Sequence, residues 1–204
     1  MSDDLKHQHH TNIIWLSFVA LGLGILLSMV IPPMKSPDEG DHVRRAYLFS
    51  EGYWLLESQH CATEEKKLCR NGKSMSGGLI DEGLADYLDI LHPMDFEKHS
   101  QNQLENSITN TLRWQGQERF VLTPGTGYYL PLVYLPQATG LKLGKLMDLS
   151  IDSSYRLARL FSLMTSILVI AAAFKIHRFP IMVMAALILP TSLFQAVSAS
   201  IDPL

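Results

Sequence analysis

Two long stretches of this 204-residue sequence, 13–31 and 179–201, contain no charged residue. At about 1.5 Å per residue, a helix of either length crosses the ~30 Å hydrocarbon core of a bilayer. We therefore expect an integral membrane protein in a cell membrane. Its 47% hydrophobic content is then no evidence of a soluble core.

The sequence also lacks the patterns of several other protein classes. It contains no Gly-rich nucleotide loop, no zinc-ligand spacing of Cys and His, and no pattern typical of a nucleophile triad. A net charge of −3 and the absence of a polybasic run argue against a nucleic-acid partner. The partner that the composition predicts is membrane lipid, and no cofactor motif is present.

Cysteine is scarce, with only Cys61 and Cys69, which both lie in the polar segment between the apolar runs. Outside the cytoplasm these two residues could form a disulfide that closes a short loop. Two free thiols are the alternative, and the sequence leaves both open.

The first apolar run is longer than the core of a typical signal peptide. Pro32-Pro33 follows it in place of a small-x-small cleavage site, which predicts an uncleaved signal anchor. A further apolar run, 155–174, is followed by the basic residues Lys175 and Arg178. The positive-inside rule assigns that short basic loop to the cytoplasm.

The hydrophobic segment 128–147 contains two prolines and two lysines, Lys142 and Lys145, which weaken it as a spanning helix. If the N-terminus is cytoplasmic, the positive-inside assignment also requires that this segment does not span. We therefore expect an interfacial or re-entrant helix there. Both lysines then lie on the same side of the membrane as Asp38, opposite Lys175.

These patterns predict an all-α, multi-pass integral membrane protein with three transmembrane helices, one juxtamembrane or re-entrant helix and a long extracytoplasmic first loop. The expected parts, in chain order, are a cytoplasmic tail (1–12), the first transmembrane helix (13–31), an extracytoplasmic loop (32–154) with an amphipathic helix (37–58) and the interfacial helix (128–147), the second transmembrane helix (155–174), a cytoplasmic loop (175–178), the third transmembrane helix (179–201) and an extracytoplasmic end (202–204).

Asp38 and Glu39 lie where the first span leaves the bilayer, in the helix-start pattern Ser36-Pro37-Asp38-Glu39. A carboxylate held there could act as a general base or as a ligand of a divalent cation, for which Asp38 is the candidate. Alternatively, both acids only stabilise the helix N-terminus through its dipole, by roughly 0.3–1 kcal/mol. The local sequence favours this second explanation.

Other residues near the predicted membrane surface are candidates for substrate binding. His42 falls one helical turn after Asp38, on the same face. Guanidinium groups bind phosphate bidentately, although they also extend to lipid headgroups without any specific role. Tyrosines at a membrane surface form an aromatic belt or a platform for a sugar. The arginines and tyrosines concerned are Arg44, Arg45, Arg156, Arg159, Tyr128, Tyr129 and Tyr134.

The order of these motifs resembles a known family. The motifs are Pro37-Asp38-Glu39 with His42, Arg45-Ala46-Tyr47, Ser50-Glu51-Gly52, Tyr128-Tyr129-Leu130-Pro131, Tyr134-Leu135-Pro136-Gln137, Arg159-Leu160 and Ser198-Ala199-Ser200-Ile201-Asp202. From residue 31 onward, the chain resembles the N-terminal part of a bacterial family of predicted membrane proteins, number 2142 among the domains of unknown function. The resemblance implies a bacterial inner or plasma membrane.

That family is in turn similar to the GT-C glycosyltransferases, which take sugars from polyprenyl-phosphate donors. The similarity implies a partial GT-C-like architecture, with catalytic acids in the first outer loop (Asp38, Glu39) and in the next (Asp202). We therefore expect the N-terminal part of a membrane glycosyltransferase of cell-envelope glycan synthesis or modification. The alternative is a non-catalytic scaffold or transport component of envelope polymer assembly.

This chain supplies fewer spans than a GT-C enzyme. It also stops directly after the second expected acid, Asp202. We therefore expect a fragment of a longer protein that is inactive by itself, because polar groups within a bilayer need partner helices.

Overall fold

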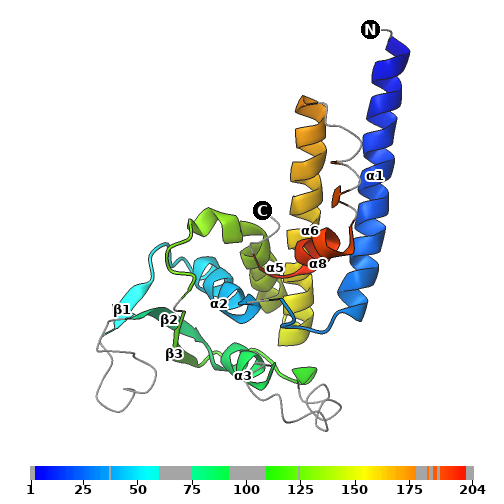
Figure 1. Cartoon of the computed structure of the whole chain (residues 1–204). Coiled ribbons are helices and arrows are strands. Elements are labelled where there is room, and N and C mark those ends of the chain that lie inside the picture. Colours follow the sequence, from blue (N-terminus) through cyan, green and yellow to red (C-terminus); the bar gives the residue numbers. More distant parts are fainter. Residues whose placement is uncertain are drawn as a thin grey trace.

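The structure is a computed structural model that describes residues 3–36, 38–59, 75–91, 109–123, 125–177, 183, 186–187 and 189–200. The described part is mostly helical. Two long helices extend from a cluster of shorter helices and a small sheet, which lie together near one end of them (Figure 1).

The long helices, α1 (Asp3–Val30) and α6 (Ile151–Ile176), run antiparallel and side by side, and α8 (Pro190–Val197) packs against both (Figure 1). The start of α6 is set by Ser150, whose side chain accepts a hydrogen bond from the Ser153 amide, as a serine N-cap does. A Cβ at Gly24 would lie only 2.7 Å from Cδ1 of Leu163. The glycine therefore allows α1 to approach α6 closely.

The sequence pattern predicted α-helices alone, and the structure adds a small antiparallel sheet. Its strands, β1 (Glu57–Gln59), β2 (Met75–Asp81) and β3 (Glu118–Leu122), pair in the order β1-β2-β3. Gly77 lies opposite Glu57 on one side and Leu122 on the other. Adjacent glycines usually favour a turn, but in β2 Leu48 packs where the side chain of Gly78 would be. The strand therefore needs glycine for close packing.

The helix α2 (Glu39–Ser50) begins two residues after the expected residue 37 and ends earlier than the expected residue 58. Gly52 has φ of +95°, a left-handed conformation that ends the helix and favours glycine. The buried Arg45 then donates hydrogen bonds of 2.9 Å to the carbonyl oxygens of both Tyr53 and Trp54. These contacts turn the chain from α2 toward the sheet. A further helix, α3 (Glu82–Leu91), follows β2 directly.

The segment 128–147 forms a 3-10 turn, η2 (Pro131–Tyr134), followed by the helix α5 (Leu135–Leu146). With 12 residues, α5 is about 18 Å long, too short to cross a bilayer. It packs antiparallel on the first turns of α6, where Gly140 faces Ala158 and Gly144 faces Ser154. A Cβ at Gly140 would lie 2.5 Å from Cα of Ala158, so larger residues would separate the two helices.

Within the described residues, α6 is the one helix long and apolar enough to cross a membrane. It begins at Ile151 rather than at the expected residue 155. The described apolar part of α1, Ile14–Val30, is shorter than the roughly 20 residues that a spanning helix needs. The third span was expected over residues 179–201. Within that range lies α8, which ends at Val197 because Ser198 adopts an extended backbone. The structure therefore does not show three spans.

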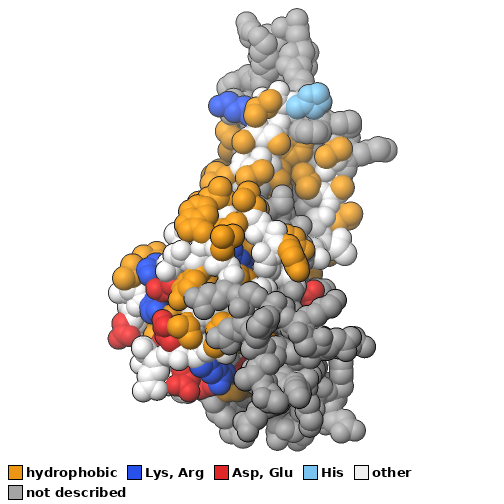
Figure 2. All heavy atoms as spheres, turned by 90° about the vertical axis from the view of Figure 1, so that its left-hand side faces the viewer, with side chains coloured by type: hydrophobic (Ala, Val, Ile, Leu, Met, Phe, Trp, Pro, Cys, Tyr) orange, Lys and Arg blue, Asp and Glu red, His pale blue; other side chains and the backbone are white. Residues whose placement is uncertain are grey.

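The surface of the described residues divides into bands along the long helices. Figure 2 shows hydrophobic side chains along the helical part, with Lys, Arg, Asp and Glu gathered on the lower part and basic and His side chains at the upper end. On α6 the exposed apolar residues include Leu168, Val169 and Ile176, at 66%, 55% and 87% exposure. Such a band suits contact with lipid.

We expect Ser150 and His177, which flank α6, to lie on opposite sides of the membrane, because 26 helical residues span about 39 Å. Single cysteines at these two positions, in a background without Cys61 and Cys69, test this on intact cells. An impermeant thiol reagent should label position 150 and spare position 177. The reverse labelling would invert the topology, and equal labelling would show that α6 does not span.

Candidate functional site

Asp38 precedes α2 in an unusual backbone conformation. Its φ of 53° and ψ of 12° are left-handed, and among non-glycine residues such a conformation costs on the order of 1–3 kcal/mol. Its side chain is exposed and accepts no capping hydrogen bond from the described residues of the helix that it precedes. A side-chain cap therefore does not explain Asp38, whose purely structural roles are the helix dipole and the tolerance of aspartate for left-handed backbone angles.

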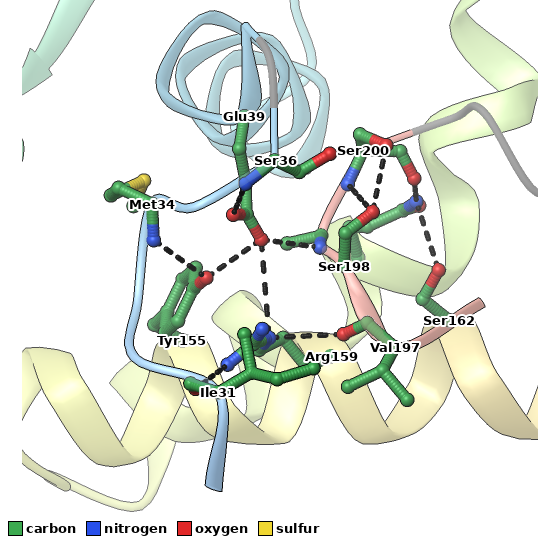
Figure 3. A network of polar contacts seen from close by, with 12 residues as sticks. Ile31, Met34, Ser36, Glu39, Tyr155, Arg159, Ser162, Val197, Ser198 and Ser200 are labelled. Atoms are coloured by element: carbon green, nitrogen blue, oxygen red, sulfur yellow. Dashed lines mark hydrogen bonds and ion pairs between the residues drawn. The ribbon is translucent and has the colours of Figure 1, made fainter. Parts of the chain in front are cut away.

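Glu39, by contrast, is buried, with 1% of its surface exposed. Its Oε1 accepts hydrogen bonds of 2.7 Å from both the Tyr155 hydroxyl and the Ala199 amide (Figure 3). Its Oε2 accepts from the Ser36 amide at 3.3 Å, which is one half of the capping box that the sequence predicts. The two neighbouring acids are thus in opposite environments.

Arg159 of α6 supplies the positive charge beside Glu39. Its Nε lies 3.9 Å from Oε1 of Glu39 and donates to the Val197 carbonyl at 2.9 Å, while Nη1 donates to the Ile31 carbonyl at 3.0 Å. These carbonyls lie at the ends of α8 and α1, where helices leave unsatisfied, partly negative oxygens. Arg159 is only 2% exposed. From the sequence we expected Arg159 to bind phosphate or to extend to lipid headgroups. Neither expectation included its burial.

A third buried polar side chain, Gln137 of α5, donates from Nε2 to the Ser200 carbonyl at 3.0 Å and to the Ser162 hydroxyl at 3.3 Å. Its Oε1 is buried and has no hydrogen-bond partner among the described residues. Glu39, Arg159 and Gln137 thus each bind the backbone of the segment 197–200, and we refer to these three side chains as the clamp. The clamp holds that segment against the start of α2 (Figure 3).

His42 packs among tyrosines. Its Nδ1 lies 2.9 Å from the Tyr134 hydroxyl, and its ring centroid is 5.9 Å from that of Tyr129. Tyr129 is 47% exposed and Tyr128 is 95% exposed, so both offer ring surface outside the fold. The structure therefore brings His42 and Tyr129 together, as parts of one aromatic cluster.

The other predicted arginines have protein partners. Arg44 binds Asp41 at 2.8 Å and Asp89 at 3.5 Å. The guanidinium of Arg45 holds the end of α2, and burial lowers its pKa. Arg156 forms a 2.7 Å ion pair with Asp152 and keeps 54% of its side chain exposed, against 11% for Arg44. Arg156 is the most accessible of the four predicted arginines.

Asp152 also accepts a 3.0 Å hydrogen bond from the hydroxyl of Tyr87 in α3. Burial and the neighbouring Asp152 carboxylate raise the pKa of Tyr87 above its ordinary value. The hydroxyl therefore stays protonated as a donor, and it ties α3 to the start of α6.

Several predicted residues lie outside the described part of the chain, namely Asp202, Cys61 and Cys69. Within the described part, no group of three or more His, Cys, Asp or Glu side chains could hold a metal ion. Among these described residues, Asp38 therefore belongs to no such group of neighbouring ligands.

Sequence reasoning did not identify Gln137 or Tyr155 as members of the network around Glu39. A signal for Gln137 was present, since a polar side chain inside an apolar helix at a membrane usually faces protein rather than lipid. For Tyr155 the sequence carries no comparable signal, because a tyrosine at the start of an apolar helix also suits the membrane surface.

The apolar α6, the band of lipid-compatible surface and the polar part at one end fit a membrane protein. The family model "Predicted membrane protein (DUF2142)" matches residues 21–204, so the chain belongs to that family, as its motifs predicted. No curated protein and no solved structure matches the chain.

Replacing Arg159 by methionine should destabilise the protein by about 3–5 kcal/mol, because it leaves the buried Glu39 carboxylate without its counter-charge. Thermal unfolding of the detergent-solubilised protein measures the effect. Arg156→Met is the matched control, since that exposed pair on the same helix should contribute at most about 1 kcal/mol. Equal melting temperatures for the two variants would contradict the role assigned to Arg159.

Proposed function

We propose that the complete protein is a membrane glycosyltransferase of the GT-C type, which transfers a sugar from a polyprenyl-phosphate donor outside the cytoplasm. One observation carries this proposal: the exposed carboxylate of Asp38 is held in a strained backbone conformation directly beside the buried Glu39. Strained residues that the surrounding structure holds in place cluster at active sites and ligand clamps.

Glycine at position 38 would avoid the backbone strain, but the chain has aspartate there. Glycine adopts left-handed backbone angles without a steric penalty, and it would serve there if only the turn mattered. Aspartate contributes a carboxylate instead. Because Glu39 is fixed by Tyr155, Ala199 and Ser36, the backbone that presents Asp38 is fixed as well.

In the proposed reaction Asp38 acts as the general base. Its carboxylate accepts the proton of the acceptor hydroxyl as that oxygen bonds to the anomeric carbon of the sugar. The bond from that carbon to the phosphate oxygen breaks, and the polyprenyl phosphate leaves with the electron pair. A positioned base of this kind contributes about 10²–10⁴-fold to a rate.

An apolar cavity supports a lipid-linked substrate. A cavity of about 290 Å³ lies between α1, α6 and α8, with mainly apolar walls that suit an isoprenoid chain. Gln195 lines that cavity and contacts the Ser36 hydroxyl at 3.5 Å, two residues before Asp38. Gln195 therefore connects the cavity wall to the segment that precedes Asp38.

Further residues enter the proposal through their surroundings. Asp202 is proposed as the second acid, because the segment that precedes it in sequence is bound by Glu39, the neighbour of Asp38. Arg156 is proposed for the donor phosphate because of its exposure, and Tyr128 and Tyr129 for stacking on the sugar.

Asp38→Asn in the full-length protein should reduce sugar transfer from a polyprenyl-phosphate donor by about 100-fold or more, with little change in melting temperature. Asparagine keeps the shape and tolerates the left-handed backbone, but it cannot take up the proton. A radiolabelled lipid-sugar assay with purified enzyme measures transfer.

Asp148→Asn is the matched control, because Asp148 has a similar φ of 52° in the turn between α5 and α6. It should transfer sugar at the normal rate. Normal transfer by Asp38→Asn would refute the general-base role. A full-length protein that folds but transfers no sugar from any polyprenyl-phosphate donor would favour the scaffold or transport component instead.

A further inference from the structure

A stretch of the chain without any charged residue lies between Arg119 and Lys142. Its last part forms η2 and the first half of α5, and it exposes Leu130, Leu132 and Leu135 at 62%, 51% and 54%. The proposed transferase site does not use these leucines. A contiguous apolar surface of this kind marks a contact with another molecule or with a membrane.

Two exposed basic residues mark the ends of the apolar part of α6. The side chain of Arg156 is 54% exposed and Lys175 is exposed, and between them the only charged residue is the buried Arg159. The 19 helical positions from Arg156 to Lys175 cover about 28 Å, close to the ~30 Å of a hydrocarbon core. The core that α6 crosses therefore extends from the level of Arg156 to that of Lys175.

The contacts between α5 and α6 give the depth of each end of α5. Near the C-terminal end of α5, Gly144 faces Ser154, which precedes Arg156 and so lies outside the core. Near the N-terminal end, Gln137 donates to the Ser162 hydroxyl at 3.3 Å. Ser162 follows Arg156 by six positions, which places it about 9 Å inside the core. The first turn of α5 therefore lies inside the core and its last turn outside.

A second apolar pair, Trp54 and Leu55, lies beside η2 and is 56% and 86% exposed. Arg45 donates to the Trp54 carbonyl at 2.9 Å, and its guanidinium carbon lies 6.0 Å from the ring of Tyr134, the last residue of η2. The segment that leads into α5 is level with the middle of α6 (Figure 1). We refer to these five exposed apolar residues as the apolar edge, namely Trp54, Leu55, Leu130, Leu132 and Leu135.

The apolar edge continues the apolar surface of the span. On α6, Met164 and Leu168 are 46% and 66% exposed at the depth of Ser162 and just beyond it. Figure 2 shows hydrophobic side chains that continue from the long helices onto the upper part of the shorter helices, above their Asp and Glu side chains. The same solvent can therefore cover both surfaces.

The backbone around the apolar edge also suits hydrocarbon, where each polar group needs a partner within the protein. Pro131 and Pro136 have no amide hydrogen that would need an acceptor. The hydroxyl of Thr139, on the exposed face of α5, donates to the Leu135 carbonyl at 2.7 Å. A hydroxyl that bonds within its own helix does not need water.

We infer that the apolar edge is buried among the acyl chains of the membrane leaflet on the Ser150 side. The segment 128–147 is then re-entrant rather than interfacial, because it enters the core at η2 and leaves it on the same side at the last turn of α5. Lys142 and Lys145 lie at the border of the core, where charged side chains near a helix end reach water.

The test attaches a nitroxide spin label to single cysteines of the full-length protein, in a background without other cysteines, in liposomes. Relaxation by molecular oxygen is compared with relaxation by a water-soluble nickel chelate. Leu132→Cys is the test position, and Leu146→Cys is the matched control, a leucine at the opposite end of the segment with 74% exposure. The oxygen-to-nickel ratio should be at least about fivefold higher at position 132, because a polar chelate enters hydrocarbon unfavourably.

A label at Leu135→Cys gives the same comparison if the variant at 132 does not fold. Equal ratios at the test and control positions would overturn the proposal. So would low access of both reagents to position 132, because protein rather than lipid would then cover the apolar edge.

A second measurement needs no label. In the same liposomes, Leu132→Lys should lower the melting temperature and Leu146→Lys should not, because a lysine within hydrocarbon is unfavourable. Equal melting temperatures for these two variants would contradict the burial of position 132.

Discussion

Two opposite charges buried side by side, on Glu39 and Arg159, connect most of the segments that meet near the N-terminal end of α6. Removing either charge from water costs several kcal/mol, so both need close polar partners. Those partners come from the end of α1, the loop before α2, the first turns of α6 and the end of α8, namely Ile31, Ser36, Tyr155, Val197 and Ala199. Satisfying one ion pair therefore brings these segments together.

In a bilayer this polar contact matters more than apolar packing alone. Lipid tails are as apolar as leucine, so helices gain little from burying leucine against one another. Small residues and polar contacts decide instead which helices meet, and α5 shows both. Gly140 and Gly144 allow it to lie directly on α6, and Gln137 binds the segment that follows α8. Its lysines contact Glu51 on a different face.

Sequence patterns succeeded where the determining physics is local. Apolar length predicted α6, and the Ser-Pro-Asp-Glu pattern predicted the start of α2 to within two residues. They failed where neighbours decide. The strand β2 looks like a loop because Gly77 and Gly78 favour turns, yet the missing side chains are what let Phe120 and Leu48 pack there.

By itself the sequence determined the membrane class, the family and the position of an acid pair beside a span, because charge and hydrophobic length are local properties. It could not distinguish the roles of Asp38 and Glu39, two adjacent acids at one helix start. Only the tertiary structure separates them, since the partners that bury Glu39 are Tyr155 and Ala199, 116 and 160 positions away. Their contacts turn one carboxylate inward, and the backbone that results exposes the other.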